Sequence, residues 1–144
     1  MKKNIIDKFR LDNKVIILTG SAGRIGQRFS HVLSDAGAHV VLVDTQEKSN
    51  KKLEKELKSR YNTNPSSFKT DITKKHNVMK LQKLVLKKYK KVDILINNAH
   101  YVPRTHPKRD APFEDYPLEL WDETISSNLR GIFLCSQEFG KIML

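Results

Sequence analysis

The sequence predicts an α/β fold in which about four parallel strands form one sheet with helices packed on it. Three observations indicate this class: short apolar runs alternate with amphipathic segments, the runs are continuous and rich in β-branched residues, and glycines directly follow the first run. Continuous apolar runs are typical of strands buried on both faces. Strand–helix alternation builds right-handed βαβ units, whose strands all end at one edge of the sheet. The length suits a single domain over residues 1–144.

The elements alternate in a regular order. We expect strands over 14–19, 39–44, 66–71 and 92–97, and helices over 24–36, 48–60, 74–91 and 118–144. A polar, proline-marked loop over about 100–117 is longer than a simple connection needs, and long loops are often functional. The first and third helices carry apolar residues at helical spacing, which we expect to face inward. These residues are Ile25, Phe29, Val32, Leu33 and Ala36 in the first, and Val78, Leu81, Val85 and Tyr89 in the third.

The chain is strongly basic, with 27 Lys and Arg against 16 Asp and Glu and a net charge of +11. Its lysines gather in 48–60 and 74–91, where Tyr89 is the one aromatic residue. We therefore expect solvated lysine faces on helices rather than a nucleic-acid interface, although a nucleic-acid binder stays open as an alternative. Cys135 is the only cysteine, and neither a signal-peptide pattern nor an apolar run of membrane-spanning length is present. We expect a cytoplasmic protein without a membrane partner.

The stretch "VIILTGSAGRIG" at 15–26 places a glycine turn between the first strand and the first helix. A helix N-terminus presents unpaired N–H groups and the positive end of a dipole, and glycines let a pyrophosphate approach the backbone. We expect Gly20 to allow the turn, Gly23 the close approach and Gly26 the packing of helix on strand. The spacing is G-x-x-G-x-x-G rather than G-x-G-x-x-G, and no Gly-Lys-Ser/Thr follows as in a P-loop.

Asp44 ends the second strand, 18 residues after Gly26 (44 − 26). A dinucleotide-binding fold has an acidic residue near this distance, which accepts hydrogen bonds from the adenosine ribose. A carboxylate there also repels a 2′-phosphate, which favours NAD over NADP. Arg24 indicates the opposite, because a guanidinium near the ribose holds that phosphate, and NADP stays possible. The alternative for Asp44 is an ordinary helix N-cap.

Four segments together resemble the short-chain dehydrogenase/reductase family, and they span nearly the whole chain. They are "TGSAGRIG" at 19–26, "TDIT" at 70–73, "NNAH" at 97–100 and "SSNLRGIFLCSQ" at 126–137. The resemblance implies a Rossmann-type, doubly wound parallel sheet that is incomplete here, and an NAD(P)-binding domain truncated before the family's catalytic Ser and Tyr-x-x-x-Lys region.

The resemblance also implies roles for individual residues. The cofactor contacts would be Gly20, Ser21, Gly23, Arg24, Ile25, Gly26, Asp44, Asp71, Ile72, Asn98 and Ala99, with no metal site. Asn97 would hold the central strands together, and Asn128 would serve only the proton relay, through a water on its backbone carbonyl.

Three features depart from the family pattern. Arg24 stands where compact members have a glycine, a spacing that resembles the longer, epimerase-like members, and His100 replaces the glycine after "NNA". None of the four tyrosines is followed by lysine four places on: the residues there are Pro65, Asp93, Thr105 and Leu120. We expect the cofactor half of the machinery to be present and the proton-transfer half to be absent.

The resemblance therefore predicts an NAD(P)-dependent oxidoreductase that moves hydride between a nicotinamide and a small-molecule alcohol or carbonyl compound, including sugar derivatives. We expect this chain alone to be inactive, and the full-length protein to form a homo-oligomer. The alternatives are a non-catalytic nucleotide-binding module and a methyltransferase, against which "NNA" and "TDIT" argue.

Overall fold

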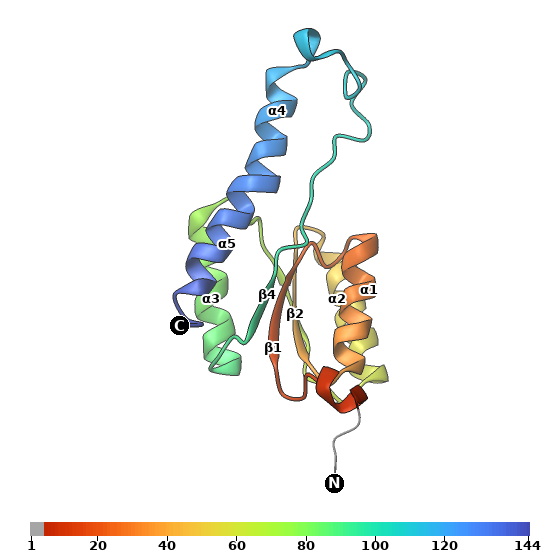
Figure 1. The fold of residues 1–144 in the computed structure, drawn as a ribbon, viewed down its shortest axis with the longest axis vertical. Coiled ribbons are helices and arrows are strands. Elements are labelled where there is room, and N and C mark those ends of the chain that lie inside the picture. Colours follow the sequence, from red (N-terminus) through yellow and green to blue (C-terminus); the bar gives the residue numbers. More distant parts are fainter. Residues whose placement is uncertain (1–4) are drawn as a thin grey trace.

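The computed structural model describes residues 5–144 and builds them around one parallel sheet (Figure 1). The four strands are β1 (Val15–Thr19), β2 (His39–Asp44), β3 (Ser66–Lys69) and β4 (Ile94–Ile96), in the order β3-β2-β1-β4. This confirms the predicted α/β class and strand number. Strands β3 and β4 are shorter than expected, because the chain leaves the ladder after Lys69 and Ile96 and continues into loops.

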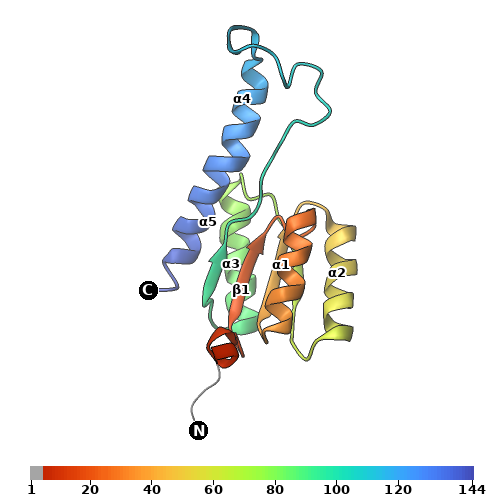
Figure 2. The same cartoon turned by 45° about the vertical axis from the view of Figure 1, so that its right-hand side comes forward.

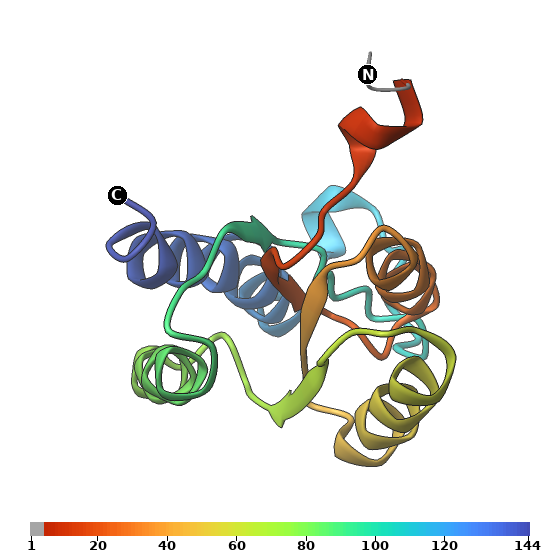
Figure 3. The ribbon, with the colours of Figure 1, turned by 90° about the horizontal axis from the view of Figure 1, so that it is seen from below.

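Helices cover both faces of the sheet, as the end-on view in Figure 3 shows. Helices α1 (Arg24–Asp35) and α2 (Glu47–Arg60) lie on one face, and α3 (Lys75–Tyr89) and α5 (Gly131–Gly140) on the other. Successive strand residues point to opposite faces, so β1 contributes to two cores. Ile16 and Leu18 belong to the core that contains Leu53 and Leu57 of α2. Val15 and Ile17 belong to the core on the α3 side, where the expected residues Val78, Leu81 and Val85 are buried.

Helix α1 buries only part of the face that its apolar pattern predicts: Leu33 packs against the core and Ala36 is half-buried. Ile25, Phe29 and Val32 are exposed, and Val32 retains 67% of its accessible surface. The buried residues of the helix are Gly26, Ser30 and Ser34. Small residues replace large ones because the helix packs closely on the strand ends, and the Ser30 hydroxyl is satisfied by the Gly26 carbonyl oxygen at 2.8 Å.

The last predicted helix is interrupted once. Helix α4 (Leu118–Ile125) continues through a π turn at Ser126–Arg130 into α5, and the helix ends at Gly140. Together with the loop that follows β4, α4 extends beyond the carboxyl edge of the sheet (Figures 1 and 2). A short 3₁₀ helix, Phe113–Asp115, joins that loop to α4. Within residues 5–144, none of the helices combines the length and the apolar character that crossing a membrane requires.

The strand order fixes where a ligand can bind. The chain runs outward from β1 through β2 to β3 and then crosses back to place β4 on the other side of β1. This reversal leaves a crevice at the carboxyl ends of β1 and β4, and ligands of open parallel sheets bind at such switch points.

Candidate functional site

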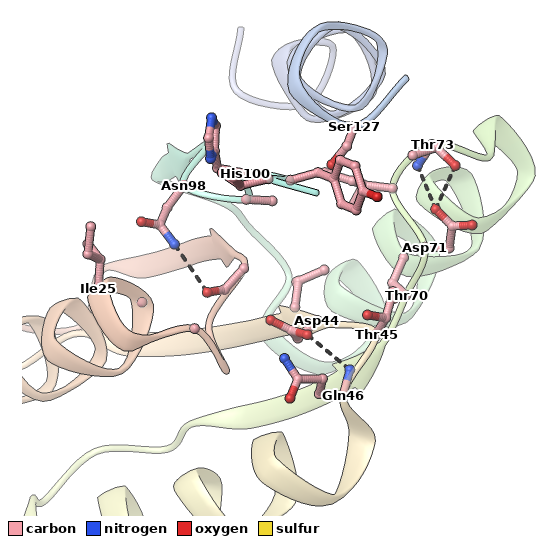
Figure 4. A pocket seen from close by; sticks show the side chains of 18 of the residues that line it. Ile25, Asp44, Thr45, Gln46, Thr70, Asp71, Thr73, Asn98, His100 and Ser127 are labelled. Carbon is pink, nitrogen blue, oxygen red and sulfur yellow. Dashed lines mark hydrogen bonds between the residues drawn. The ribbon is translucent and has the colours of Figure 1, made fainter. Parts of the chain in front are cut away.

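A pocket of about 600 Å³ lies at the carboxyl edge of the sheet. The segments that follow all four strands contribute to it. Its lining includes Gly20, Gly23, Arg24, Ile25, Gly26, Asp44, Gln46, Asp71, Ile72, Asn98, Ala99, His100, Tyr101, Arg104 and Ser127. In Figure 4, Asp44 and Gln46 lie at one side of this space and Asn98 and His100 at the other. The volume is typical of pockets for cofactors and other small ligands.

The glycine turn is packed too tightly for other residues. Gly20 has a φ of +66°, and a Cβ there would lie 2.7 Å from the Cα atom of Ala99. A Cβ at Gly26 would overlap the Gly20 carbonyl oxygen and lie 2.7 Å from the Cα atom of Ser21. Gly20 thus allows the turn, and Gly26 lets α1 begin directly against it, as expected. The first N–H groups of α1 face the pocket region with no side-chain cap on Gly23.

Asn98 connects the glycine turn to the end of β4. Its side-chain amide donates to the carbonyl oxygens of Thr19 and Gly20, at 3.0 and 3.1 Å. In return, the Thr19 hydroxyl oxygen accepts the backbone N–H groups of Asn98 and Ala99, both at 3.0 Å. The role expected of Asn97 therefore belongs to Asn98. Asn97 instead donates to the Ser136 hydroxyl at 3.1 Å, because its side chain extends to the α5 side of the sheet.

The Asp44 carboxylate is held in place by the backbone. One oxygen accepts the Ala22 N–H at 3.0 Å, and the other accepts the Gln46 N–H at 2.9 Å. Gln46, not Asp44, is the N-cap of α2, so the N-cap alternative is wrong. Each carboxylate oxygen keeps a lone pair for a further donor, and the group faces the pocket.

Ser21 lies outside the pocket lining, in contrast to the prediction. Its side chain is buried and donates to Asn50 Oδ1 at 2.7 Å, while the Asn50 amide donates to the Leu42 carbonyl oxygen. The side chain therefore braces α2 against the turn and cannot reach a ligand. Arg24 and Ile25 lie in the first turn of α1 and are both exposed at the pocket.

The segment after β3 forms another wall of the pocket. Asp71 accepts the N–H and the hydroxyl of Thr73, at 2.9 and 2.7 Å, which fixes its carboxylate. Ile72 is buried against Gly131, where a Cβ would lie 2.8 Å from the Ile72 Cδ1 atom. The absence of a side chain at Gly131 thus lets the last helix close onto this wall.

Asn128 lies in the π turn and holds the loop after β4. Its Oδ1 accepts the Tyr101 N–H at 2.7 Å, and its Nδ2 donates to the Tyr101 carbonyl oxygen at 3.0 Å. π turns are frequent at functional sites. The side chain therefore positions the pocket wall, a role that the sequence did not indicate.

Thr19, Gln46, Tyr101 and Arg104 are site residues that the sequence reasoning missed. A usable signal existed only for Thr19, which precedes the glycine turn directly. The Tyr101 hydroxyl donates to Glu123 Oε2 at 2.5 Å, and this hydrogen bond raises the pKa of Tyr101 above its ordinary value. Within residues 5–144, no group of three His, Cys, Asp or Glu side chains is arranged to hold a metal ion.

The family model of the short chain dehydrogenases matches residues 14–144. The chain is 35% identical over 137 residues to an NAD-dependent glycerol dehydrogenase of Listeria innocua, covering 94% of this chain and 50% of the relative. It is 32% identical over 136 residues to a D-threitol dehydrogenase of Mycolicibacterium smegmatis, with the same coverage. The chain thus spans about half the length of both relatives.

Solved structures show the same fold. A 7α-hydroxysteroid dehydrogenase, complexed with NADH and 7-oxo glycochenodeoxycholic acid, superimposes on this chain with 29% sequence identity. The superposition has a TM-score of 0.86 and covers 98% of this chain and 52% of the steroid dehydrogenase. The match to the family model over nearly all of the sequence, joined to this fold, shows that the chain belongs to the short-chain dehydrogenase family.

Proposed function

We propose that the chain binds NAD at its carboxyl-edge pocket and supplies the cofactor half of an oxidoreductase. The reaction would move hydride between the nicotinamide and an alcohol or carbonyl carbon of a small molecule, including polyols and other sugar derivatives. The observation that carries the proposal is the single pocket in which Asp44, the glycine turn and the Asn98–Ala99 segment meet.

The residues present fit a dinucleotide. Asp44, fixed by two backbone N–H groups, would accept the hydroxyls of the adenosine ribose. Gly20 and Gly26 let the turn pack closely against the N-terminus of α1, whose unpaired N–H groups would hold the pyrophosphate. Asp71 and Ile72 would border the adenine, and Asn98 and Ala99 would lie toward the nicotinamide. When bound, the nicotinamide supplies hydride transfer, which no side chain of this chain can perform.

The Tyr-x-x-x-Lys pair that would supply proton transfer is not found in this sequence. Tyr101 is the tyrosine that lines the pocket, but its hydroxyl is engaged by Glu123 and its pKa is raised, the opposite of what a general base near neutral pH needs. This observation supports a second candidate function, a nucleotide-binding module without catalysis. Both candidates predict cofactor binding, and only the first predicts that the chain is part of a longer, active enzyme.

The relatives differ in what their names say they act on, a polyol in two cases and a steroid ligand in the third. We propose the polyol and sugar class because the two curated relatives share it. For the full-length protein we propose a homo-oligomer in the cytoplasm. The exposed Leu129 and Phe133 on the last helix support an interface there.

Calorimetric titration with NAD, NADP and ADP-ribose tests the cofactor proposal. We expect NAD and ADP-ribose to bind, and Asp44→Asn to weaken NAD by roughly tenfold or more because hydrogen bonds to a charged acceptor are lost. NADP should lose less in this variant, since repulsion of the 2′-phosphate is relieved at the same time. Asp122→Asn, an exposed carboxylate on α4, is the matched control and should leave all three affinities unchanged. Absence of binding by all three ligands would refute the proposal.

A further inference from the structure

The charged side chains that line the pocket are Asp44, Asp71, Arg24 and Arg104. Asp44 and Asp71 follow β2 and β3, Arg24 begins helix α1 at the glycine turn, and Arg104 follows β4 on the other side of β1. Both carboxylates are occupied by local donors, Asp44 by two backbone N–H groups and Asp71 by Thr73. The proposed cofactor would use the two carboxylates and the glycine turn with Arg24, which leaves Arg104 as the charged lining residue on the β4 side.

Arg104 has a fixed backbone and an unused side chain. Its N–H donates to the Val102 carbonyl oxygen at 2.8 Å, and its own carbonyl oxygen accepts Arg109 Nη1 at 3.0 Å. Arg109 forms an ion pair with Asp110, with 2.8 Å between Arg109 Nε and Asp110 Oδ2. No carboxylate pairs with the Arg104 guanidinium among residues 5–144. Three residues upstream, the loop is held to the π turn by Asn128, so the loop that carries Arg104 is anchored to the body of the fold.

An unpaired guanidinium at the edge of a pocket is suited to one class of ligand. Its planar fork of donors matches a carboxylate or phosphate, and such charge-assisted pairs are stronger than neutral hydrogen bonds. A neutral polyol would leave this cation without a partner. The loop around it reinforces the positive field, because residues 100–110 contain three Arg or Lys and one Asp.

We propose that Arg104 forms an anion subsite in the substrate half of the pocket, and that the substrate carries a carboxylate close to its reacting carbon. This inference rests on the proposed function, because it assigns the side of the pocket with the two carboxylates to the cofactor. It narrows the substrate class from polyols in general to sugar acids and related hydroxy acids.

The test compares D-gluconate with D-glucitol, which share a six-carbon polyol chain and differ by a carboxylate at one end. Each is titrated by NMR into the 144-residue chain, with and without saturating NADH. We expect gluconate to bind about tenfold more tightly than glucitol, and Arg104→Gln to remove that preference while leaving NADH affinity unchanged. Lys108→Gln makes the same charge change on the loop outside the pocket lining, and it should retain the preference.

Four results would overturn the proposal. Gluconate and glucitol could bind equally, or neither could bind. Lys108→Gln could lose the preference for gluconate as fully as Arg104→Gln does, or Arg104→Gln could lose NADH affinity to a matching extent, which would assign Arg104 to the cofactor. The titrations without NADH separate this proposal from the previous one. If NADH does not bind but gluconate keeps its dependence on Arg104, the cofactor proposal fails and the anion subsite stands.

Discussion

Gly26→Ala tests whether the close start of helix α1 shapes the pocket. The new methyl group would overlap the Gly20 carbonyl oxygen and lie 2.7 Å from the Ser21 Cα atom, and both neighbours are backbone. Carbon atoms pack best at about 3.5–4.0 Å, so the helix must move by roughly 1 Å relative to the turn. Because no flexible side chain can give way, the strain falls on the segment that would hold the pyrophosphate.

The expected cost follows from two opposing effects. Overpacking of this kind costs about 1–3 kcal/mol, whereas alanine is favoured over glycine inside a helix by up to about 1 kcal/mol. The free energy of unfolding should therefore fall by about 1–2 kcal/mol. Affinity for NAD should fall by roughly tenfold or more, since at least one hydrogen bond to a charged phosphate is misaligned.

Urea unfolding and calorimetric titration of Gly26→Ala measure both effects. Gly140→Ala is the matched control, because a Cβ at Gly140 meets no atom within 4 Å and the residue lies at the end of α5. This control should be neutral or more stable by about 0.4–1 kcal/mol, with unchanged NAD affinity. Wild-type stability and NAD affinity in Gly26→Ala would refute the reasoning.

Three further outcomes follow from single contacts. Asn98→Ala removes two hydrogen bonds to the glycine turn and should lower the free energy of unfolding by about 1–3 kcal/mol in urea, more than Asn97→Ala does; equal losses would contradict the assignment. Burial raises the pKa of Tyr89 from 10.0 to about 12, so the neutral phenol stabilises the fold fully below pH 10 and this stability is lost as pH rises toward 12. In Tyr89→Phe, the free energy of unfolding should no longer fall between pH 10 and pH 12. A fall that persists in this variant would exclude Tyr89 as its cause. Burial acts to raise the pKa of Asp93, but the Val15 N–H and two lysines outweigh it and hold the pKa below 3.8. The stability that Asp93 contributes is therefore present above pH 3.8 and is lost as the pH falls through its lower pKa in the folded state. In Asp93→Asn, the free energy of unfolding should depend less on pH in this acid range. An unchanged dependence on pH would argue that Asp93 does not contribute this stability.

The strands, their order of appearance and the glycine turn could be predicted from the sequence because each has a strong local cause. Continuous β-branched runs produced β1 and β2, and glycines followed β1 where the backbone needs a positive φ at Gly20. The packing face of α1 could not be predicted in this way. Its apolar residues have helical spacing, but the distance between helix and sheet, not hydrophobicity, decided that Gly26, Ser30 and Ser34 face inward.

The site was predictable in outline and less so in its contacts. Asp44 and the glycines entered the pocket as expected, since parallel strands end at one edge. Asn98, rather than Asn97, bridges the glycine turn because of the face that each residue takes as β4 ends, and the sequence does not determine this register. Hydrogen bonds between Asn128, in the π turn, and Tyr101 join residues 27 positions apart, and no local sequence pattern indicates such a contact.

The central claim is that a dinucleotide lies along the carboxyl edge from Asp44 to Asn98. Backbone amide NMR of the isotope-labelled chain during an NAD titration tests it most directly. We expect saturable shifts for the amides of residues 20–26, 44–46, 70–73 and 98–101, and none for the opposite edge at residues 12–14 and 37–39. A titration without shifts, or with shifts confined to the lysine-rich outer faces of α2 and α3, would contradict it.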